Sequence, residues 1–85
     1  MITNNEIEQV FVYEGNKYIV EFDCEFDRNE VVYVGVTRVE VYEPGLAVDA
    51  DVFAAAVESA QSTAEQMQLE YVAGIEASIG EYWLP

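Results

Sequence analysis

Alternation of polar and apolar side chains over residues 17–27 (KYIVEFDCEFD) is the feature that most restricts the fold. Successive side chains of a β-strand point to opposite faces, so a period of two predicts a strand with one packed face and one wet face. The packed set comprises Tyr18, Val20, Phe22, Cys24 and Phe26. The wet set comprises Lys17, Glu21, Asp23, Glu25 and Asp27, with Ile19 as its one apolar member. A hydrophobic layer is therefore needed on one side of this strand.

Two further strands are predicted beside it. Residues 6–13 (EIEQVFVY) lead into a turn at Glu14-Gly15. Residues 30–42 (EVVYVGVTRVEVY) follow a tight turn at Arg28-Asn29. The first half of this later run is apolar on both faces, which is typical of a covered strand, and its Gly35 indicates a bulge or bend. The short connections predict an antiparallel meander.

Beyond Pro44-Gly45 the chain becomes rich in Ala, Glu and Gln, which predicts helix. Asp49 and Asp51 suit the N-cap and first turn of that helix, and Gly80 suits its end. A capping-box pattern at Thr63-Gln66 indicates two shorter helices instead of one. Apolar residues at steps of three and four form one arc and favour an unbroken helix: Phe53, Val57, Ala60, Ala64, Met67, Tyr71 and Ile75.

Eighty-five residues predict a single α+β domain. It has a three-stranded antiparallel meander sheet over residues 6–43, one long C-terminal helix or two shorter helices over residues 49–80 packed on one face, and a tail at 81–85. An unbroken helix would be about 45 Å long, against about 33 Å for a ten-residue strand, so its end would overhang the sheet. Exposed apolar residues there would favour a homodimer or another partner. The candidate contacts are Tyr71, Ile75, Ile79 and Trp83.

Charge restricts the function. The chain has 17 Asp and Glu residues against Lys17, Arg28 and Arg38, with no histidine and a net charge of −14. It is nevertheless 52% hydrophobic, so it is expected to fold. Such a charge opposes direct binding to nucleic acid or to an anionic membrane, and leaves a basic protein or a cation as the partner. Since Met1–Gln9 lack a signal-peptide pattern, a cytoplasmic protein is expected.

Catalysis and metal binding find little support. The chain has no histidine, no glycine-rich phosphate loop, and one cysteine, Cys24, which is expected to be buried. An EF-hand alignment of the run starting at Asp23 fails, because Arg28 replaces the required glycine and Val34 the required glutamate. Alternate strand carboxylates lie about 6.7 Å apart, too far to chelate one ion. No enzyme activity, cofactor or metal is therefore expected.

The same spacing fits a row of phosphates. Every second phosphate of a DNA strand is about 6.8 Å further along the axis. The strand residues that would imitate such a row are Glu21, Asp23, Glu25 and Asp27, unless they are an ordinary solvated strand face. A second acidic set lies opposite the apolar arc of the helix, at Asp51, Glu58, Glu65 and Glu76. No Lys or Arg follows Arg38, so the helix lacks the mixed charge of most solvent-facing helices.

In size, acid excess and predicted elements, the chain resembles phage-encoded DNA-mimic inhibitors, the anti-restriction and anti-CRISPR proteins. The resemblance implies a protein in the host cell cytoplasm that occupies the nucleic-acid channel of a defence enzyme through its two carboxylate rows. Two alternatives remain. One is an immunity protein or antitoxin against a basic nuclease toxin, and the other is a small structural or assembly subunit acting through its helix.

Overall fold

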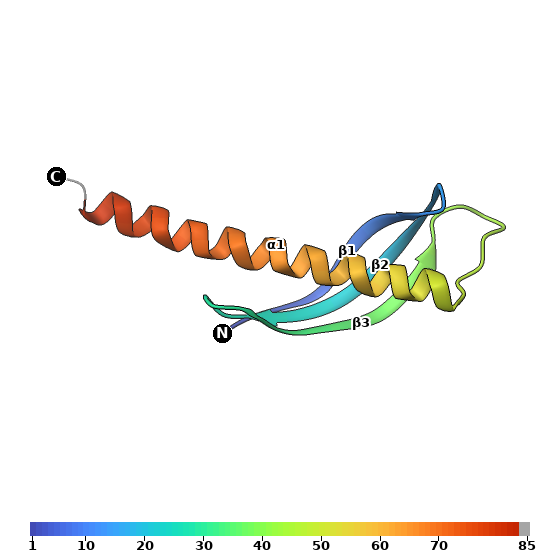
Figure 1. Ribbon diagram of the computed structural model, residues 1–85, viewed down its shortest axis with the longest axis horizontal. Helices are drawn as coiled ribbons and strands as arrows, with labels where there is room; N and C mark the ends of the chain where they lie inside the picture. Colours follow the sequence, from blue (N-terminus) through green and yellow to red (C-terminus); the bar gives the residue numbers. More distant parts are fainter. Residues whose placement is uncertain (84–85) are drawn as a thin grey trace.

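The computed structural model describes the backbone of residues 1–83 and the side chains of residues 1–75. Within this part of the chain, three strands precede one helix: β1 (Ile2–Tyr13), β2 (Asn16–Phe26), β3 (Val31–Val41) and α1 (Ala50–Trp83). The sheet is antiparallel in the order β1-β2-β3, and α1 packs across one of its faces (Figure 1). The predicted α+β meander followed by a C-terminal helix is confirmed.

Both tight turns have a local cause in the sequence. Glu14 and Gly15 adopt positive φ angles of 49° and 80°, as a type I′ hairpin turn requires. In the next turn, Asp27 Oδ1 accepts hydrogen bonds from the N–H groups of Asn29 (2.7 Å) and Glu30 (2.9 Å). The Asp27 N–H in turn donates to the Glu30 carbonyl at 2.9 Å. The Asp27 carboxylate thus closes the β2–β3 hairpin.

The edge strands are less regular than the sequence predicts. β1 begins at Ile2, whereas the sequence predicts a start at residue 6. Residues 2–4 and 7–13 both pair with β2, and an irregularity between them, where Glu6 has a φ of 55°, lies inside the one strand. In β3, Val32 and Thr37 are left without partners in β2. Gly35 is not the bulge that the sequence indicates. It pairs with Asp23, and a Cβ on it would lie 2.6 Å from Cζ of the tyrosine two residues earlier.

The core lies between β2 and α1. The even-numbered residues of β2 from Tyr18 to Phe26 are at most 4% exposed, which confirms the alternation and the burial of Cys24. The helix contributes mainly small side chains, which let it approach the sheet closely. Its buried residues are Val52, Ala56, Ala60, Ala64 and Gln68.

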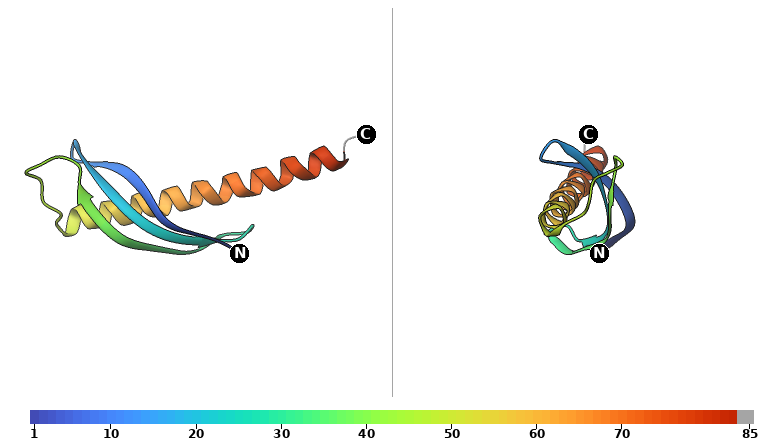
Figure 2. Two further views of the ribbon diagram at one scale, coloured as in Figure 1. Left: turned by 180° about the vertical axis from the view of Figure 1, so that it is seen from behind. Right: turned by 90° about the vertical axis from the view of Figure 1, so that its right-hand side faces the viewer.

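The buried stripe of α1 differs from the predicted arc. Buried positions recur every four residues, so each step turns about 40° and the stripe winds about 160° between Val52 and Gln68. The twisted sheet curls around the helix and requires this winding (Figure 2). The predicted arc was therefore wrong for Phe53, Val57 and Tyr71, which are 47%, 37% and 36% exposed. Its central alanines are buried as predicted.

The helix is continuous and extends beyond the sheet (Figure 1). No second helix starts at Thr63, and α1 passes the predicted stop at Gly80 to end at Trp83. Near the β2–β3 turn, Gln68 Nε2 donates to the Asp27 carbonyl at 3.2 Å, and the Tyr71 ring lies 5.7 Å from that of Phe26. The result is a rod with Cα extents of 59 × 21 × 17 Å.

Candidate interaction surfaces

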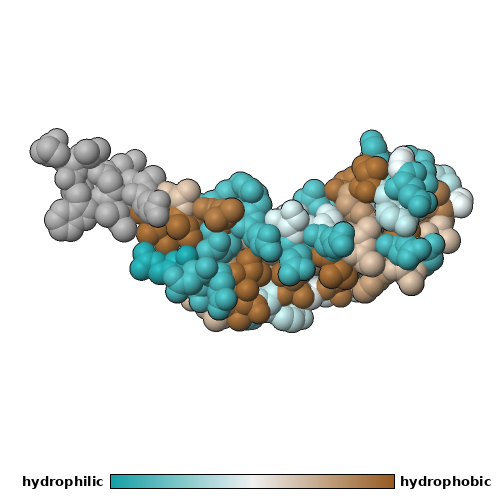
Figure 3. Space-filling view, in the orientation of Figure 1, coloured by the Kyte–Doolittle hydropathy of each residue, from teal (hydrophilic) through white to brown (hydrophobic). Residues whose placement is uncertain are grey.

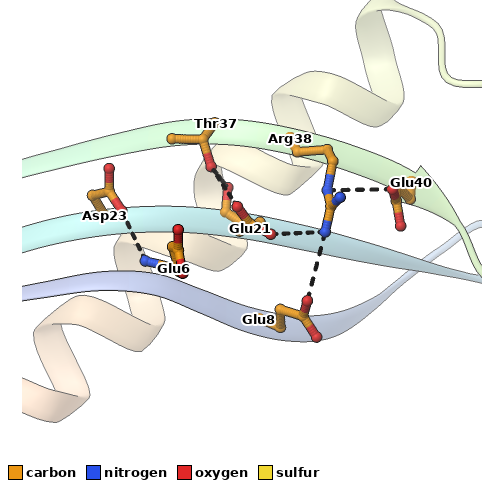
Figure 4. A network of polar contacts seen from close by, with 7 residues as sticks. All are labelled: Glu6, Glu8, Glu21, Asp23, Thr37, Arg38 and Glu40. Carbon is orange, nitrogen blue, oxygen red and sulfur yellow. Dashed lines mark hydrogen bonds and ion pairs between the residues drawn. The ribbon is translucent and has the colours of Figure 1, made fainter.

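A network around Arg38 occupies the wet face of the sheet (Figure 4). Strand register places Arg38 opposite Glu21, and Glu21 opposite Glu8. Arg38 Nη2 lies 2.7 Å from Glu21 Oε2 and 3.6 Å from Glu8 Oε1, while its Nε lies 3.2 Å from Glu40 Oε1. One guanidinium therefore partly neutralises three carboxylates, one from each strand.

The predicted carboxylate row on β2 is partly occupied by intramolecular contacts. Glu21 binds Arg38, and Asp23 Oδ1 accepts a hydrogen bond from the Glu6 N–H at 2.8 Å. Asp27 closes the turn, and its backbone hydrogen bonds lower the pKa of its carboxyl group. Glu25, like the other three, is only half-buried. Glu21, Asp23 and Asp27 of this row thus each contact another part of the sheet or its turn.

The helical row is more accessible. Asp51, Glu58 and Glu65 are all exposed, and none of them forms an ion pair with the described residues. Steps of seven residues turn the position by only about 20°, so the three lie almost on a straight line along α1. The side chain of Glu76, the fourth predicted member, lies outside those described.

The two rows do not form one surface. α1 covers the even-numbered face of β2, whereas Glu21 and Asp23 project from the opposite face, with the helix behind them (Figure 4). A flat partner cannot contact both rows at once. A partner that encloses the rod in a channel can reach both.

The charge density of the rod lies in the range of a nucleic acid strand. A net charge of −14 over 59 Å is one charge per about 4.2 Å (59/14). One strand of a DNA duplex carries one charge per about 3.4 Å of axis, and the whole duplex carries one per about 1.7 Å. The rod is therefore closer to a single strand than to a duplex.

Among the described residues, a groove lies on each side of α1, and neither was predicted from the sequence. The groove beside β3, of about 380 Å³, is lined by residues 30–34 together with Val57, Gln61 and Glu65. The groove beside β1, of about 620 Å³, is lined by residues 11–13 and by residues of the first turns of α1, including Asp51 and Glu58. The apolar run 31–36 was the available signal for the first groove, but it was interpreted as a covered strand. In fact Val32 and Tyr33 are 48% and 53% exposed.

Of the candidate oligomer contacts, Tyr71 lies beside Phe26 at the end of the sheet, and Ile75, Ile79 and Trp83 follow it along α1. Tyr71 is 36% exposed and Ile75 is half-buried, while the side chains of Ile79 and Trp83 lie outside those described. Leu69, which the sequence did not single out, is 60% exposed. This segment presents apolar surface to water.

The described side chains include no cluster of three His, Cys, Asp or Glu that could hold a metal ion. Burial raises the pKa of the Cys24 thiol, with a smaller contribution from the negative charge of Asp23. A thiol with a raised pKa is a poor nucleophile. Among the described residues, no helix has the length and apolar character to cross a membrane.

Comparisons of the chain with known protein families, with characterised proteins and with solved structures found no match. The functional interpretation therefore depends on the shape, charge and exposed side chains of this chain.

Proposed function

We propose that the protein is an acidic mimic of nucleic acid. It binds a basic nucleic-acid-binding protein, such as a CRISPR effector or a restriction enzyme, and blocks its contact with nucleic acid. The observation that carries this proposal is the line of carboxylates on α1 that form no ion pair within the described part of the chain, along a thin rod with a net charge of −14. Lys and Arg side chains that donate hydrogen bonds to phosphate oxygens can donate to carboxylate oxygens in the same way.

The arrangement of the two rows supports a channel as the binding site. A channel wall of Lys and Arg on one side meets the helical carboxylates, and the opposite wall meets those on β2. Complementary potentials accelerate association, and the bound rod then excludes nucleic acid by competition.

The test is DNA cleavage by a panel of purified restriction enzymes and CRISPR effector nucleases. We expect inhibition of at least one enzyme when the protein is added before DNA at about 50 mM salt, and loss of inhibition near 500 mM, because salt screens exposed charges. DNA added first should protect the enzyme. Absence of inhibition across the panel, or inhibition that ignores salt, would contradict the proposal.

A matched pair of triple variants tests the helical row. Changing Asp51→Asn, Glu58→Gln and Glu65→Gln together should weaken inhibition about tenfold or more, at up to about 1 kcal/mol for each ion pair. The control removes three exposed acids elsewhere, at Glu14, Glu43 and Glu70, and loses the same net charge. If both triple variants lose inhibition equally, the net charge of the protein explains inhibition and the helical row has no specific part in it.

A second candidate is an assembly subunit, which the overhang of α1 favours. A helix of about 12 residues is marginal in water without packing. Leu69 and Tyr71, which lie where α1 leaves the sheet and are 60% and 36% exposed, give an apolar surface that a second copy would cover. In this case light scattering should give twice the mass of the chain, and Leu69→Ser with Tyr71→Ser should restore the monomer. If the wild-type protein is still a monomer at about 100 μM, its dimer dissociation constant is too weak for this role, and the role is excluded.

A further inference from the structure

The groove beside β3 opens along the edge of the sheet. Alternate side chains of a strand point to opposite faces, so a cavity lined by five consecutive residues, 30–34, lies at the open edge of the strand. The other wall consists of Val57, Gln61 and Glu65, which are spaced four residues apart on one flank of α1. The groove therefore runs between a strand edge and a helix, a geometry that accepts an extended chain.

The lining of this groove combines polar side chains with apolar ones that are incompletely covered. Val32, from β3, and Val57, from α1, both line it and are 48% and 37% exposed. Residues 31–37 contain no charge, and such a segment on an edge strand normally requires a cover. Figure 3 shows hydrophobic side chains at the surface along the middle of the molecule, where β3 runs beside α1.

The irregularities of β3 limit what can pair with it. Val32 and Thr37 interrupt the ladder and leave residues 33–36 as a regular stretch between them. Bulges of this kind discourage open-ended pairing of sheets. They leave the outer edge of residues 33–36 open to a short segment, whose backbone would pair there and whose side chains would enter the groove.

Charge identifies the occupant. The charged residues that line the groove, Glu30 and Glu65, are both acidic. A second copy of this chain is a poor occupant, because its cations, Lys17, Arg28 and Arg38, stand ten or more residues apart. No short segment of it brings two cations to the groove. We propose that the β3–α1 groove docks an extended segment of another protein in which an apolar side chain is flanked by Lys or Arg.

This inference rests on the proposed function for the basic character of the partner, and deepens it. Binding to such a segment adds an apolar contact to the electrostatic attraction. The surface can then discriminate between basic proteins. Carboxylates alone discriminate poorly, because any Lys or Arg can pair with them.

The experiment is an NMR titration of the full chain with two synthetic peptides of equal charge, one alternating Lys with Val and the other alternating Lys with Ser. We expect the Lys/Val peptide to bind about tenfold more tightly, because a buried valine is worth at least that factor. Its largest amide shifts should fall in residues 30–36 and 57–65. Equal affinities, or shifts spread over the whole acidic surface, would overturn the proposal.

Paired variants locate the contact. Val57→Ala should remove most of the difference between the peptides, whereas Leu69→Ala, which changes an exposed residue of α1 outside the groove, should leave it intact. Glu65→Gln should weaken both peptides roughly threefold, and Glu58→Gln, on the β1 side, should not. Helix-preserving changes of exposed residues keep the fold. Equal effects within either pair would sink the assignment.

The cleavage assay separates the two ideas. If Val57→Ala has no effect on peptide binding while the wild-type protein inhibits a nuclease, the groove assignment fails and the proposed function stands. If the Lys/Val peptide binds in the groove and no nuclease is inhibited, the proposed function fails and the groove stands.

Discussion

Arg38 is one of three cations in the chain, and its guanidinium is directed at its own sheet. Without it, Glu8 and Glu21 would lie opposite each other on adjacent strands with Glu40 on the diagonal, and like charges opposite each other destabilise a sheet. We expect Arg38→Gln to lower the free energy of unfolding by about 1 kcal/mol at low salt, and by less at high salt.

Urea denaturation at about 20 mM and 500 mM salt measures this effect, since those concentrations span weak and strong screening. Arg28→Gln is the matched control, because Arg28 is exposed and forms no ion pair with the described residues. If both variants lose the same stability, overall charge explains the result and the network does not.

Asp27 gives the sheet a dependence on pH. Two backbone N–H groups hydrogen-bond its carboxylate and hold its pKa below the ordinary value in the folded chain. The unfolded chain keeps an ordinary pKa of about 3.9. Because the folded pKa is the lower one, the stabilisation is fully present above about pH 5, and it is lost as pH falls through the folded pKa.

Asp27→Asn removes this ionisation while keeping an acceptor oxygen. The difference in unfolding free energy between wild type and Asp27→Asn should be constant from about pH 7 to pH 5 and should shrink below about pH 4, which urea midpoints measured along the pH range will test. A difference that persists undiminished at about pH 2, below the ordinary pKa, would contradict this origin.

At the scale of elements, the small residues of α1 set its distance from the sheet. Ala56, Ala60 and Ala64 are fully buried against β2. Ala60→Leu should therefore destabilise the fold by about 1–3 kcal/mol through overpacking. Ala73→Leu, at an exposed position of the same helix, should change stability by less than about 0.5 kcal/mol. Thermal melts by circular dichroism give both values, and similar losses would refute the close helix–sheet contact.

The sequence predicted the elements better than their contacts. The alternation of β2 could be predicted because the period of a strand is a local property. The N-cap at Asp49 is local too, because its Oδ1 accepts the Val52 N–H three residues later, at 2.9 Å. The buried stripe of α1 was not readable, because its winding depends on the twist of a sheet formed by distant residues. The partners of Glu21 and Asp23 depend on register across three strands, which the sequence does not specify locally.

At the scale of the molecule, elongation separates this chain from an ordinary small domain. Its Cα radius of gyration is 16.0 Å. A compact chain of this length has about 12 Å, so the helix must stay extended in solution for the rod to exist. Small-angle scattering at low concentration should therefore give a radius near the larger value. A value near the smaller one would mean that α1 folds back, and would remove the shape on which the channel argument depends.

Salt dependence distinguishes the two candidate roles, because the forces behind them respond oppositely. Binding of a basic partner by carboxylates weakens as salt screens the attraction. Self-association through Leu69 and Tyr71 brings two chains of charge −14 together, so screening of their repulsion should strengthen it. We expect light scattering to show a monomer both at about 50 mM and at about 500 mM salt, a range that spans weak and strong screening. Nuclease inhibition should disappear over the same range. A dimer that appears only at high salt would favour assembly through the helix.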